Sequence, residues 1–324
     1  MKRRQFLQAA TGAVLFGCAA GARAQADYPQ QPIRIVVPAS AGGGTDLIAR
    51  VIANAVAANT GWTVVVDNRA GASGIIGTEA VAKARPDGYT LNMALTATVA
   101  INPELFRSLP YDVLKDFVPV ATVAEQPVVL VVRADSPYRN VADLVVAHKA
   151  KKLSLATAGA GTVGQLVGER FGTAVGMKFL NVPYKGSAPA IQDVAAGVTD
   201  CIFATPPGAI PLLQANRLRA LAVSSGKRIP LLPDVPTLTE IGYQDFEATE
   251  WKVLLAPAGT PPAVIEALNR EVQKALGQPA TIARILADGS LPMSSSAAAA
   301  KTFLRTELSR WGGMVRESGL SRTN

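Results

Sequence analysis

The feature that most constrains the fold of this 324-residue chain is one local pattern that occurs twice. Each copy is a short apolar run, a glycine-rich loop, a helical pattern, a single glycine and a second apolar run; the loops are residues 42–45 and 159–162. Short β-branched runs that alternate with longer helical patterns are typical of α/β layers. The repeated pattern therefore predicts two similar lobes. Each lobe has a helix N-terminus at the carboxyl end of its sheet, where open α/β sheets bind ligands.

The same alternation continues along the chain and predicts sheets that are mainly parallel and flanked by helices. Runs of β-branched and apolar residues predict strands at 33–37, 62–66, 89–93, 128–132, 153–156, 178–182, 198–203, 220–223 and 253–256. Helical periodicity predicts helices at 46–59, 262–276 and 297–318. The second of these helices begins at Pro262, a position that proline tolerates well.

The first 24 residues have the pattern of an export signal. Lys2, Arg3 and Arg4 precede an apolar stretch, and small residues favour cleavage before Gln25, with Ala24-Gln25-Ala26 as the alternative site. Loss of four basic residues with this segment changes 32 Lys and Arg against 24 Asp and Glu to 28 against 24, so the net charge falls from +8 to +4. No later segment offers about 18 uninterrupted apolar residues, so we expect the exported chain to be soluble.

The export route depends on how the N-terminal residues are interpreted. Arg3-Arg4-Gln5-Phe6-Leu7 resembles the twin-arginine export motif, and an ordinary secretory signal that contains two arginines is the alternative. A third interpretation is a lipid anchor through Cys18, because residues 15–18 are similar to a lipobox, although Phe16 is bulky for that motif. We predict the twin-arginine route.

The residues that most catalytic and metal sites need are missing. The one histidine, His148, lies in a polar segment and is expected on a solvated helix face, and Cys201 is expected to be a small buried hydrophobe. Ser-His-Asp and Cys-His catalysis would both need that histidine, and metal sites need several ligands. No basic run with interleaved aromatic residues supports nucleic acid binding. We therefore predict no enzyme activity, no cofactor, no metal and no nucleic acid partner.

One motif favours an enzyme. Residues 159–164 match the G-x-G-x-x-G fingerprint of dinucleotide-binding proteins and lie between a predicted strand and a predicted helix. The fingerprint also requires an acidic residue about twenty positions further on. The next predicted strand ends at Asn181 and Val182 without one. An exported NAD(P)-binding oxidoreductase is therefore kept as an alternative.

The two glycine loops are the candidate site. Unpaired N–H groups and the dipole at a helix N-terminus favour anions, and glycine lets the backbone approach a ligand closely. Thr45 and Thr162 add a hydroxyl group to each loop, whereas Asp46 is expected to orient its own loop. Two such loops facing each other across a cleft would bind a carboxylate without an arginine; two ordinary βα turns are the alternative.

Ten short motifs occur in order along the exported chain, among them Val37-Pro-x-x-x-Gly-Gly-Gly-Thr-Asp46 and Val182-Pro-Tyr-Lys-Gly186. The others lie at 28–33, 68–74, 86–91, 109–112, 116–120, 219–223, 232–237 and 256–261. Together they resemble the Bug family, the receptors of tripartite tricarboxylate transporters.

This resemblance implies a two-lobed periplasmic binding protein of type II, the Venus flytrap arrangement, that delivers its ligand to a membrane permease. After a signal peptide at 1–24, it places residues 25–124 and 225–324 in one lobe and 125–224 in the other. The ligand would be an aromatic or aliphatic mono- or dicarboxylate, and the protein would be a monomer without a cofactor. A sensory module that presents the ligand to a kinase is an alternative.

Carried over residue by residue, the resemblance assigns ligand-binding loops to both lobes. Those of the first lobe contain Ala39, Ser40, Gly43, Gly44, Thr45, Asp46, Ala72, Ser73, Thr96 and Thr98. Those of the second lobe contain Thr157, Ala158, Gly159, Gly161, Thr162 and Ala204. Three positions depart from the family pattern: Ala39 replaces a common Phe, Ala204 a common Asp, and Gln165 a common His. Since Ala204 offers no partner to an ammonium group, we predict a carboxylate without an amino group in preference to aspartate or glutamate.

Overall fold

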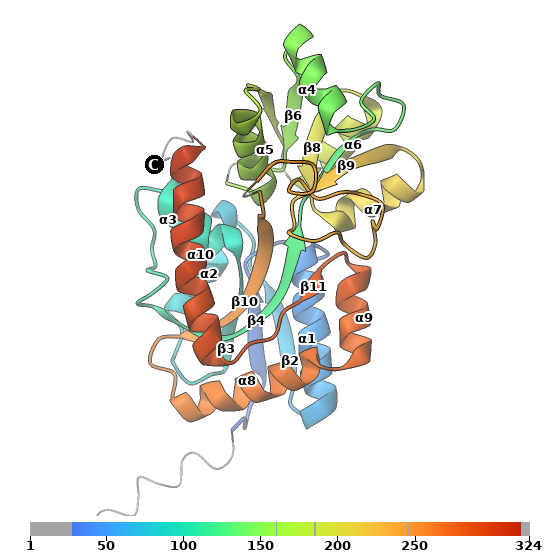
Figure 1. Ribbon diagram of the computed structural model, residues 1–324. Helices are drawn as coiled ribbons and strands as arrows, with labels where there is room; N and C mark the ends of the chain where they lie inside the picture. Colours follow the sequence, from blue (N-terminus) through green and yellow to red (C-terminus); the bar gives the residue numbers. More distant parts are fainter. Residues whose placement is uncertain (1–27, 160, 185, 245, 319–324) are drawn as a thin grey trace, which may run out of the picture.

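The computed structural model describes residues 28–318, except 160, 185 and 245, and contains two separate β-sheets. The first sheet has the strand order β11-β4-β10-β3-β1-β2, and the second has the order β7-β6-β8-β5-β9. Figure 1 shows the first sheet and its helices below the second. Each sheet with the helices packed on it is one lobe, so the predicted two-lobed α/β architecture is confirmed. The export signal and Cys18 lie outside the described residues.

The first lobe is built from both ends of the described chain, and the second from its middle. The strands of the first sheet are β1 (Ile33–Val37), β2 (Val64–Asn68), β3 (Thr90–Leu95), β4 (Phe117–Pro127), β10 (Thr249–Pro257) and β11 (Leu291–Pro292). Its helices are α1 (Gly44–Thr60), α2 (Ile75–Ala82), α3 (Asn102–Leu105), α8 (Pro262–Leu276), α9 (Pro279–Ala287) and α10 (Ala297–Glu317), with a short turn η1 (Ala72–Gly74) and a π-helical turn η2 (Ala97–Ile101).

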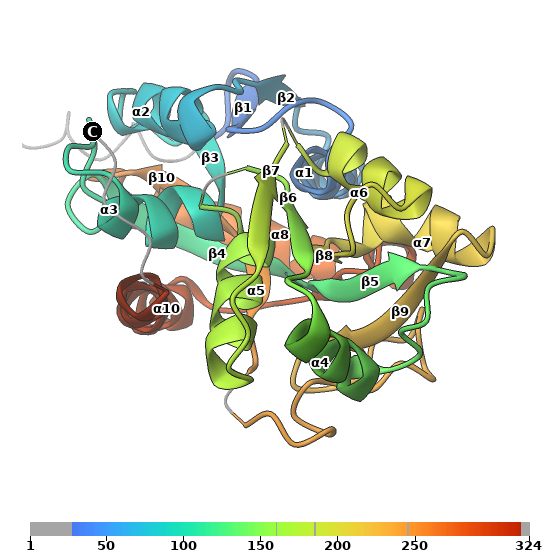
Figure 2. The ribbon, with the colours of Figure 1, turned by 90° about the horizontal axis from the view of Figure 1, so that it is seen from above.

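The second lobe alternates strands with helices. Its strands are β5 (Val129–Arg133), β6 (Ser154–Thr157), β7 (Leu180–Pro183), β8 (Cys201–Ala204) and β9 (Leu218–Val223). Its helices are α4 (Val141–Ala150), α5 (Val163–Ala174), α6 (Ser187–Ala196) and α7 (Pro206–Gln214), which Figure 2 shows from above. In the part of the chain that the structure describes, no helix is both long enough and apolar enough to cross a membrane.

Helices cover both faces of the first sheet and bury alternate residues of its strands. Ile33, Ile35 and Val37 of β1 pack with α1 and α8, whereas Val36 packs on the opposite side of the sheet. In α8, apolar residues recur with helical spacing on the side that meets α1 and the sheet. The predicted bounds of β1 and α8 are confirmed without change.

The sheets are mixed and not mainly parallel, which corrects the expectation from the sequence. β1 runs parallel to β2 and β3, and β6 runs parallel to β7 and β8. However, β10 is antiparallel to β3 and β4, β11 is antiparallel to β4, and β5 is antiparallel to β8 and β9. The reason is that the chain passes between the lobes twice. β4 leads into the second lobe and β10 returns from it, so β10 enters the first sheet from the edge at which the parallel strands end.

Two short connections, residues 127–129 and 248–249, join the lobes, and we call them the hinge. The hydroxyl group of Ser224 links the two connections. It accepts the N–H of Val128 at 2.9 Å and donates to the carbonyl of Ala248 at 2.6 Å. Ser224 is fully buried, so both connections are tied to one point.

Residues 225–248 lie against the second lobe. The rings of Tyr243 and Phe246 pack on Phe171 of α5, at centroid distances of 5.3 and 6.1 Å. Val223, the last residue of β9, also forms a bridge with Thr237. These contacts attach the described parts of this segment to the second lobe before the chain returns to the first.

Candidate ligand-binding cleft

The carboxyl ends of the parallel strands in the two lobes face each other. β1, β3 and β4 all run opposite to β10, so they end at the edge from which the chain enters the second lobe. β5 starts at that connection, and β6, β7 and β8 run opposite to it, so they end beside the hinge as well. The loops that follow β1 and β6 are the two glycine loops. The topology therefore brings both of them to the facing ends of the two sheets, the end at which open α/β sheets bind ligands.

In the first lobe, the predicted loops pack closely against one another. Gly74 has a φ of +83°, and a side chain at this position would lie 2.4 Å from Thr98 Cγ2 and 2.9 Å from the Pro38 carbonyl oxygen. The amide of Asn102 also donates a hydrogen bond to the carbonyl of Ser73 at 3.0 Å. Because these contacts leave no space for a side chain, position 74 requires glycine. They also hold the loop after β1, the turn η1 and the turn η2 together as one surface.

The turn η1 carries backbone strain. Ala72 and Ser73 have φ values of +46° and +54°, between Gly71 at +130° and Gly74 at +83°. Non-glycine residues with positive φ are uncommon and are concentrated at binding sites. This strain, which the sequence did not reveal, supports the inclusion of η1 in the candidate site.

The N-terminus of α1 is shaped by Asp46. The first N–H groups of α1, like those of any α-helix, have no partner within the helix, and Gly43, which precedes it, has no side chain to cap them. The buried carboxylate of Asp46 accepts the N–H of Gly42 at 2.8 Å and pairs with Arg50 at 3.0 Å. Burial opposes ionisation of Asp46, but the hydrogen bonds from Arg50 and Gly42 outweigh it and hold the pKa below its usual value. Asp46 therefore orients its own loop, as predicted.

The second-lobe loop is supported by its own helix. Gly161 donates its N–H to Gln165 Oε1 at 2.9 Å, and the hydroxyl group of Thr162 donates to the carbonyl of Gly159 at 3.0 Å. Gly159 and Gly161 have φ values of +124° and +74°, which only glycine adopts easily. Gln165, which stands where the family commonly has histidine, therefore stabilises the loop backbone.

Several predicted site residues are buried in this conformation. Thr96 exchanges two hydrogen bonds with the backbone of Trp251, at 2.8 and 3.3 Å, and Thr98 donates to the last carbonyl of β3 at 3.0 Å. Thr157 and Ala204, at the ends of β6 and β8, are also buried. The predicted residues with exposed or half-buried surface are Ala39, Ser40, Gly43, Gly44, Ala72, Ser73, Ala158, Gly159 and Thr162. The buried residues support the loops, and this second group forms the accessible surface.

The two lobes touch beside the second glycine loop. A side chain on Gly161 would lie 2.7 Å from Leu105 Cδ2 and 3.6 Å from Ile101 Cγ2, both in the first lobe. Val163 and Leu166 of α5 belong to the same apolar cluster as Leu105. The structure therefore shows the lobes in contact through α3 and the start of α5.

The structure adds a turn that the sequence did not predict, residues 288–290 after α9. A side chain on Gly44 would lie 3.3 Å from Gln126 Oε1 and 3.6 Å from Asp288 Oδ2. A side chain on Gly289 would lie 2.4 Å from Cβ of Pro206, the first residue of α7. The turn is therefore placed between the first glycine loop and the second-lobe helix that follows Ala204. An Asp-Gly pair indicates a turn, but nothing local in the sequence places it at the cleft.

The two residues considered for catalysis are structural. His148 lies half-buried near the end of α4, and the backbone N–H groups of Leu153 and Lys178 lie 3.4 and 3.2 Å from its two ring nitrogens, so that one of them can donate to the neutral ring. Cys201 is fully buried as predicted, and burial raises the pKa of its thiol far above the usual range. Among the described residues, no group of His, Cys, Asp and Glu side chains is placed to hold a metal ion.

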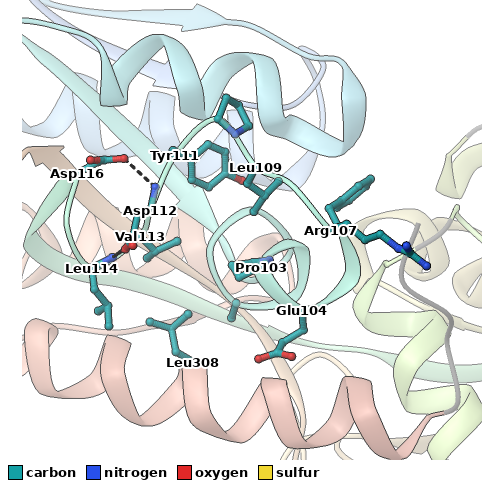
Figure 3. Close-up of a pocket in the computed structure, with 13 residues that line it drawn as sticks. Pro103, Glu104, Arg107, Leu109, Tyr111, Asp112, Val113, Leu114, Asp116 and Leu308 are labelled. Carbon is teal, nitrogen blue, oxygen red and sulfur yellow. Dashed lines mark hydrogen bonds between the residues drawn. The ribbon is translucent and has the colours of Figure 1, made fainter. Parts of the chain in front are cut away.

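A cavity of about 660 Å³ lies outside the cleft, between α3, residues 106–116 and α10 (Figure 3). Tyr111 lines this cavity, and its hydroxyl group donates to the carbonyl of Thr98 at 2.7 Å, so the cavity lies behind η2. Burial raises the pKa of Tyr111 to about 12. None of the predicted site residues lines this cavity. It is therefore distinct from the cleft.

The fold and the facing loops define a two-lobed solute-binding protein. The family model described as tripartite tricarboxylate transporter family receptor matches residues 48–320. The protein BugT of Bordetella pertussis is 38% identical over 295 residues, which cover 90% of this chain and 90% of BugT. The chain therefore belongs to the tripartite tricarboxylate transporter receptor family, as its motifs indicated.

Solved structures agree with this assignment. R. palustris Rpa4515 with adipate has a TM-score of 0.85 and 34% identity, and the match covers 91% of this chain and 99% of that chain. MatC from Rhodopseudomonas palustris with bound malate has a TM-score of 0.79 and 31% identity, and the match covers 89% and 100% of the two chains. The family consists of periplasmic substrate-binding receptors. The protein is thus a periplasmic solute-binding protein and not an enzyme, so the oxidoreductase alternative is wrong.

Proposed function

We propose that this protein captures a small organic carboxylate in the cleft between its lobes and delivers it to the membrane permease of a tripartite tricarboxylate transporter. The observation that carries the proposal is the placement of two glycine loops at the facing carboxyl ends of the two sheets. Helix N-termini at such positions favour anions. The relatives bound to adipate and malate support a carboxylate ligand.

For the lobes, we propose that one contains residues 28–127 and 249–318 and the other contains residues 128–248. Sheet membership supports this division, and so does the packing of residues 225–248 on the second lobe. The return crossing then follows residue 248, and does not lie at 225. The ligand would contact the exposed backbone of the loops at Ser40, Gly43 and Gly44, of η1, and of Gly159 and Thr162.

Within the carboxylates, we propose an acid without an amino group. Ala204 is buried at the end of β8, and its methyl side chain provides no carboxylate for an ammonium group, which is costly to bury unpaired. Ala39 is half-buried and leaves apolar room where the family commonly has phenylalanine. Both features favour an aromatic or extended aliphatic acid over aspartate or glutamate.

A thermal-shift panel of adipate, malate, benzoate, aspartate and glutamate tests this proposal. A ligand that binds only the folded protein stabilises it by about 2.7 kcal/mol at a hundredfold excess over Kd. For a chain of this size, the melting temperature should rise by several degrees. Binding of aspartate or glutamate without any response to the other acids would contradict the proposed ligand type. No shift with any acid would contradict carboxylate capture itself.

The partner and the export route are also proposals. We propose a monomer that is exported by a twin-arginine signal at 1–24, is not anchored through Cys18, binds no nucleic acid, and acts in transport and not in sensing. The periplasmic location of the family supports export, and the family description supports a permease. Deletion of the permease gene should abolish uptake of the bound acid. Two results together would favour the sensory alternative. Uptake would be unchanged in the strain without the permease, and a strain without the binding protein would lose its transcriptional response to the acid.

A further inference from the structure

A polar cluster lies directly behind the first glycine loop. Lys252 of β10 is fully buried, and its ammonium group donates to Gln126 Oε1 at 3.2 Å. The Nε2 of Gln126 donates to Ser290 Oγ at 3.0 Å and lies 3.4 Å from Oδ2 of Asp288. A side chain on Gly44, the first residue of α1, would lie 3.6 Å from the same carboxylate oxygen. The Asp288 carboxylate is therefore adjacent to the N-terminus of α1, where a ligand carboxylate is proposed to bind.

The turn that carries Asp288 also touches the second lobe. Gly289 has a φ of +73°, and a side chain there would lie 2.4 Å from Pro206 Cβ and 3.6 Å from Leu231 Cδ1. Pro206 begins α7, directly after the loop that follows Ala204. Asp288 thus lies beside the first glycine loop and the end of β4, in a turn whose next residue touches the second lobe.

Two charged side chains of β10, Lys252 and Glu250, act on the Asp288 carboxylate. The buried ammonium group of Lys252 lies 3.6 Å from Glu250 Oε1, so its charge is shared between two acids. Burial raises the pKa of Asp288 above its usual value, in spite of the attraction of Lys252 and the hydrogen bonds from Ser290 and Gln126, and Glu250 raises it further. The buried ammonium group of Lys252 therefore already acts on two acids before a ligand carboxylate binds.

The remaining elements add little charge. On α1, Asp46 and Arg50 pair with each other. On α9, Arg284 lies one helical turn before Asp288 and is exposed to solvent, where its charge is screened. The second-lobe residues that touch the turn, Pro206 and Leu231, are apolar.

We infer that Asp288 couples ligand capture to protonation. When a carboxylate binds at the N-terminus of α1, one proton from the solvent enters the site and is shared between the ligand and the Asp288 carboxylate. The inference rests on the proposed function, because it requires the ligand carboxylate to bind beside Gly44. Two carboxylates that share a site cannot both stay ionised without a large cost, so one of them takes up a proton.

Proton uptake makes the affinity depend on pH. Because the liganded protein holds more protons than the free protein, the affinity rises as the pH falls, by up to about tenfold per pH unit between the two pKa values of Asp288. An ammonium-bearing ligand would behave differently, because its positive charge would pair with the ionised Asp288 and no proton would enter.

Titration calorimetry with adipate and with malate, in buffers that differ in ionisation enthalpy, tests the inference. For the wild type, the binding enthalpy should change linearly with the buffer enthalpy, and the slope should give an uptake of up to about one proton. Asp288→Asn should show no slope and no pH dependence. It should also bind the acid at least as tightly as the wild type above neutral pH, since the repulsion is removed while the amide oxygen still accepts from Gln126. Asp234→Asn, at an exposed position of the second lobe, is the matched control and should behave as the wild type.

The outcomes separate the inference from the proposed function. Binding by the wild type with enthalpies that do not depend on the buffer overturns the inference and leaves carboxylate capture intact. Proton uptake that persists in Asp288→Asn, together with weaker binding, also overturns it, because Asp288 would then be only structural. Failure of both acids to bind at any pH contradicts the proposed function, and the inference with it.

Discussion

Replacement of Gly161 by alanine should weaken ligand binding because it opposes lobe closure. The Cβ atom of an alanine at this position would lie 2.7 Å from Leu105 Cδ2 in the other lobe, closer than van der Waals contact allows. When the lobes separate, this overlap disappears. The substitution therefore raises the energy of the conformation in which the lobes touch relative to one in which they are apart, and a ligand that contacts both lobes stabilises only the former, the closed state.

Two contributions to the magnitude can be separated. A φ of +74° costs an alanine about 1–2 kcal/mol in the open and closed states alike, and this cost appears in the free energy of unfolding. Overpacking against Leu105 costs about 1–3 kcal/mol in the closed state alone. Because Cδ2 is the flexible end of its side chain, the lower part of this range applies. At about 1–2 kcal/mol, Kd should rise roughly 5- to 30-fold.

Gly176 provides the matched control. It has a φ of +68°, but no atom lies within 4 Å of the place where its Cβ would be. Gly176→Ala should therefore lower the free energy of unfolding about as much as Gly161→Ala, measured by urea denaturation, while Kd stays unchanged in calorimetry. In a Leu105→Ala background, the effect of Gly161→Ala on Kd should largely disappear. An equal loss of affinity with and without Leu105 would refute the closure argument.

Three further predictions address closure, export and acid stability. A bound acid should reduce the radius of gyration in small-angle scattering, and an unchanged radius with a verified ligand would argue against lobe closure. Exchange of Arg3 and Arg4 for lysine should block periplasmic accumulation, and undiminished accumulation would show that the general secretory route is used. Burial raises the pKa of Asp200, but the hydrogen bonds that it accepts from Ser154 and Lys151 outweigh burial and lower it. The ionised Asp200 therefore stabilises the fold above its unfolded pKa near 4. This stabilisation is lost as the pH falls through the lower pKa of the folded protein. Asp200→Asn should therefore lower the free energy of unfolding by about 1 kcal/mol at pH 7 and by less at pH 3, and an equal loss at both pH values would contradict this account.

Helices and strands whose apolar residues follow a regular spacing along the sequence could be predicted, whereas those without such a spacing could not. β1 and α8 have the predicted bounds. The strand expected at 62–66 lies two residues later, at Val64–Asn68, and Trp62 precedes it with its ring packed edge-on against Tyr28. β4 was missed because it is buried almost throughout, so its residues do not alternate, and Pro119 interrupts the run. Strand direction could not be predicted either, since it depends on the double crossing between the lobes.

The candidate site divides in the same way. The glycine loops could be predicted because a strand, a glycine and a helix N-terminus are neighbours in the sequence. Lys252 and Asp288 could not be predicted as neighbours of Gly44. A lysine in an apolar run is expected on an exposed face, and an Asp-Gly pair indicates only a turn. Their proximity arises from the return of β10 and from the packing of α9, which are tertiary features.

The inner position of β10 in the first sheet determines the order in which the chain can fold. All strands of the second sheet lie within one continuous stretch, so that sheet can form once residue 223 is available, and its lobe is complete once residues 224–248 follow. The first sheet lacks the strand between β3 and β4 until residues 249–257 arrive, and the helices α8, α9 and α10 that cover it follow later still. The part of this sheet that α8, α9 and α10 cover therefore stays exposed until synthesis is nearly complete, a state in which chains are prone to aggregate. A chain cut before residue 249 would contain one finished lobe and one sheet split into two parts.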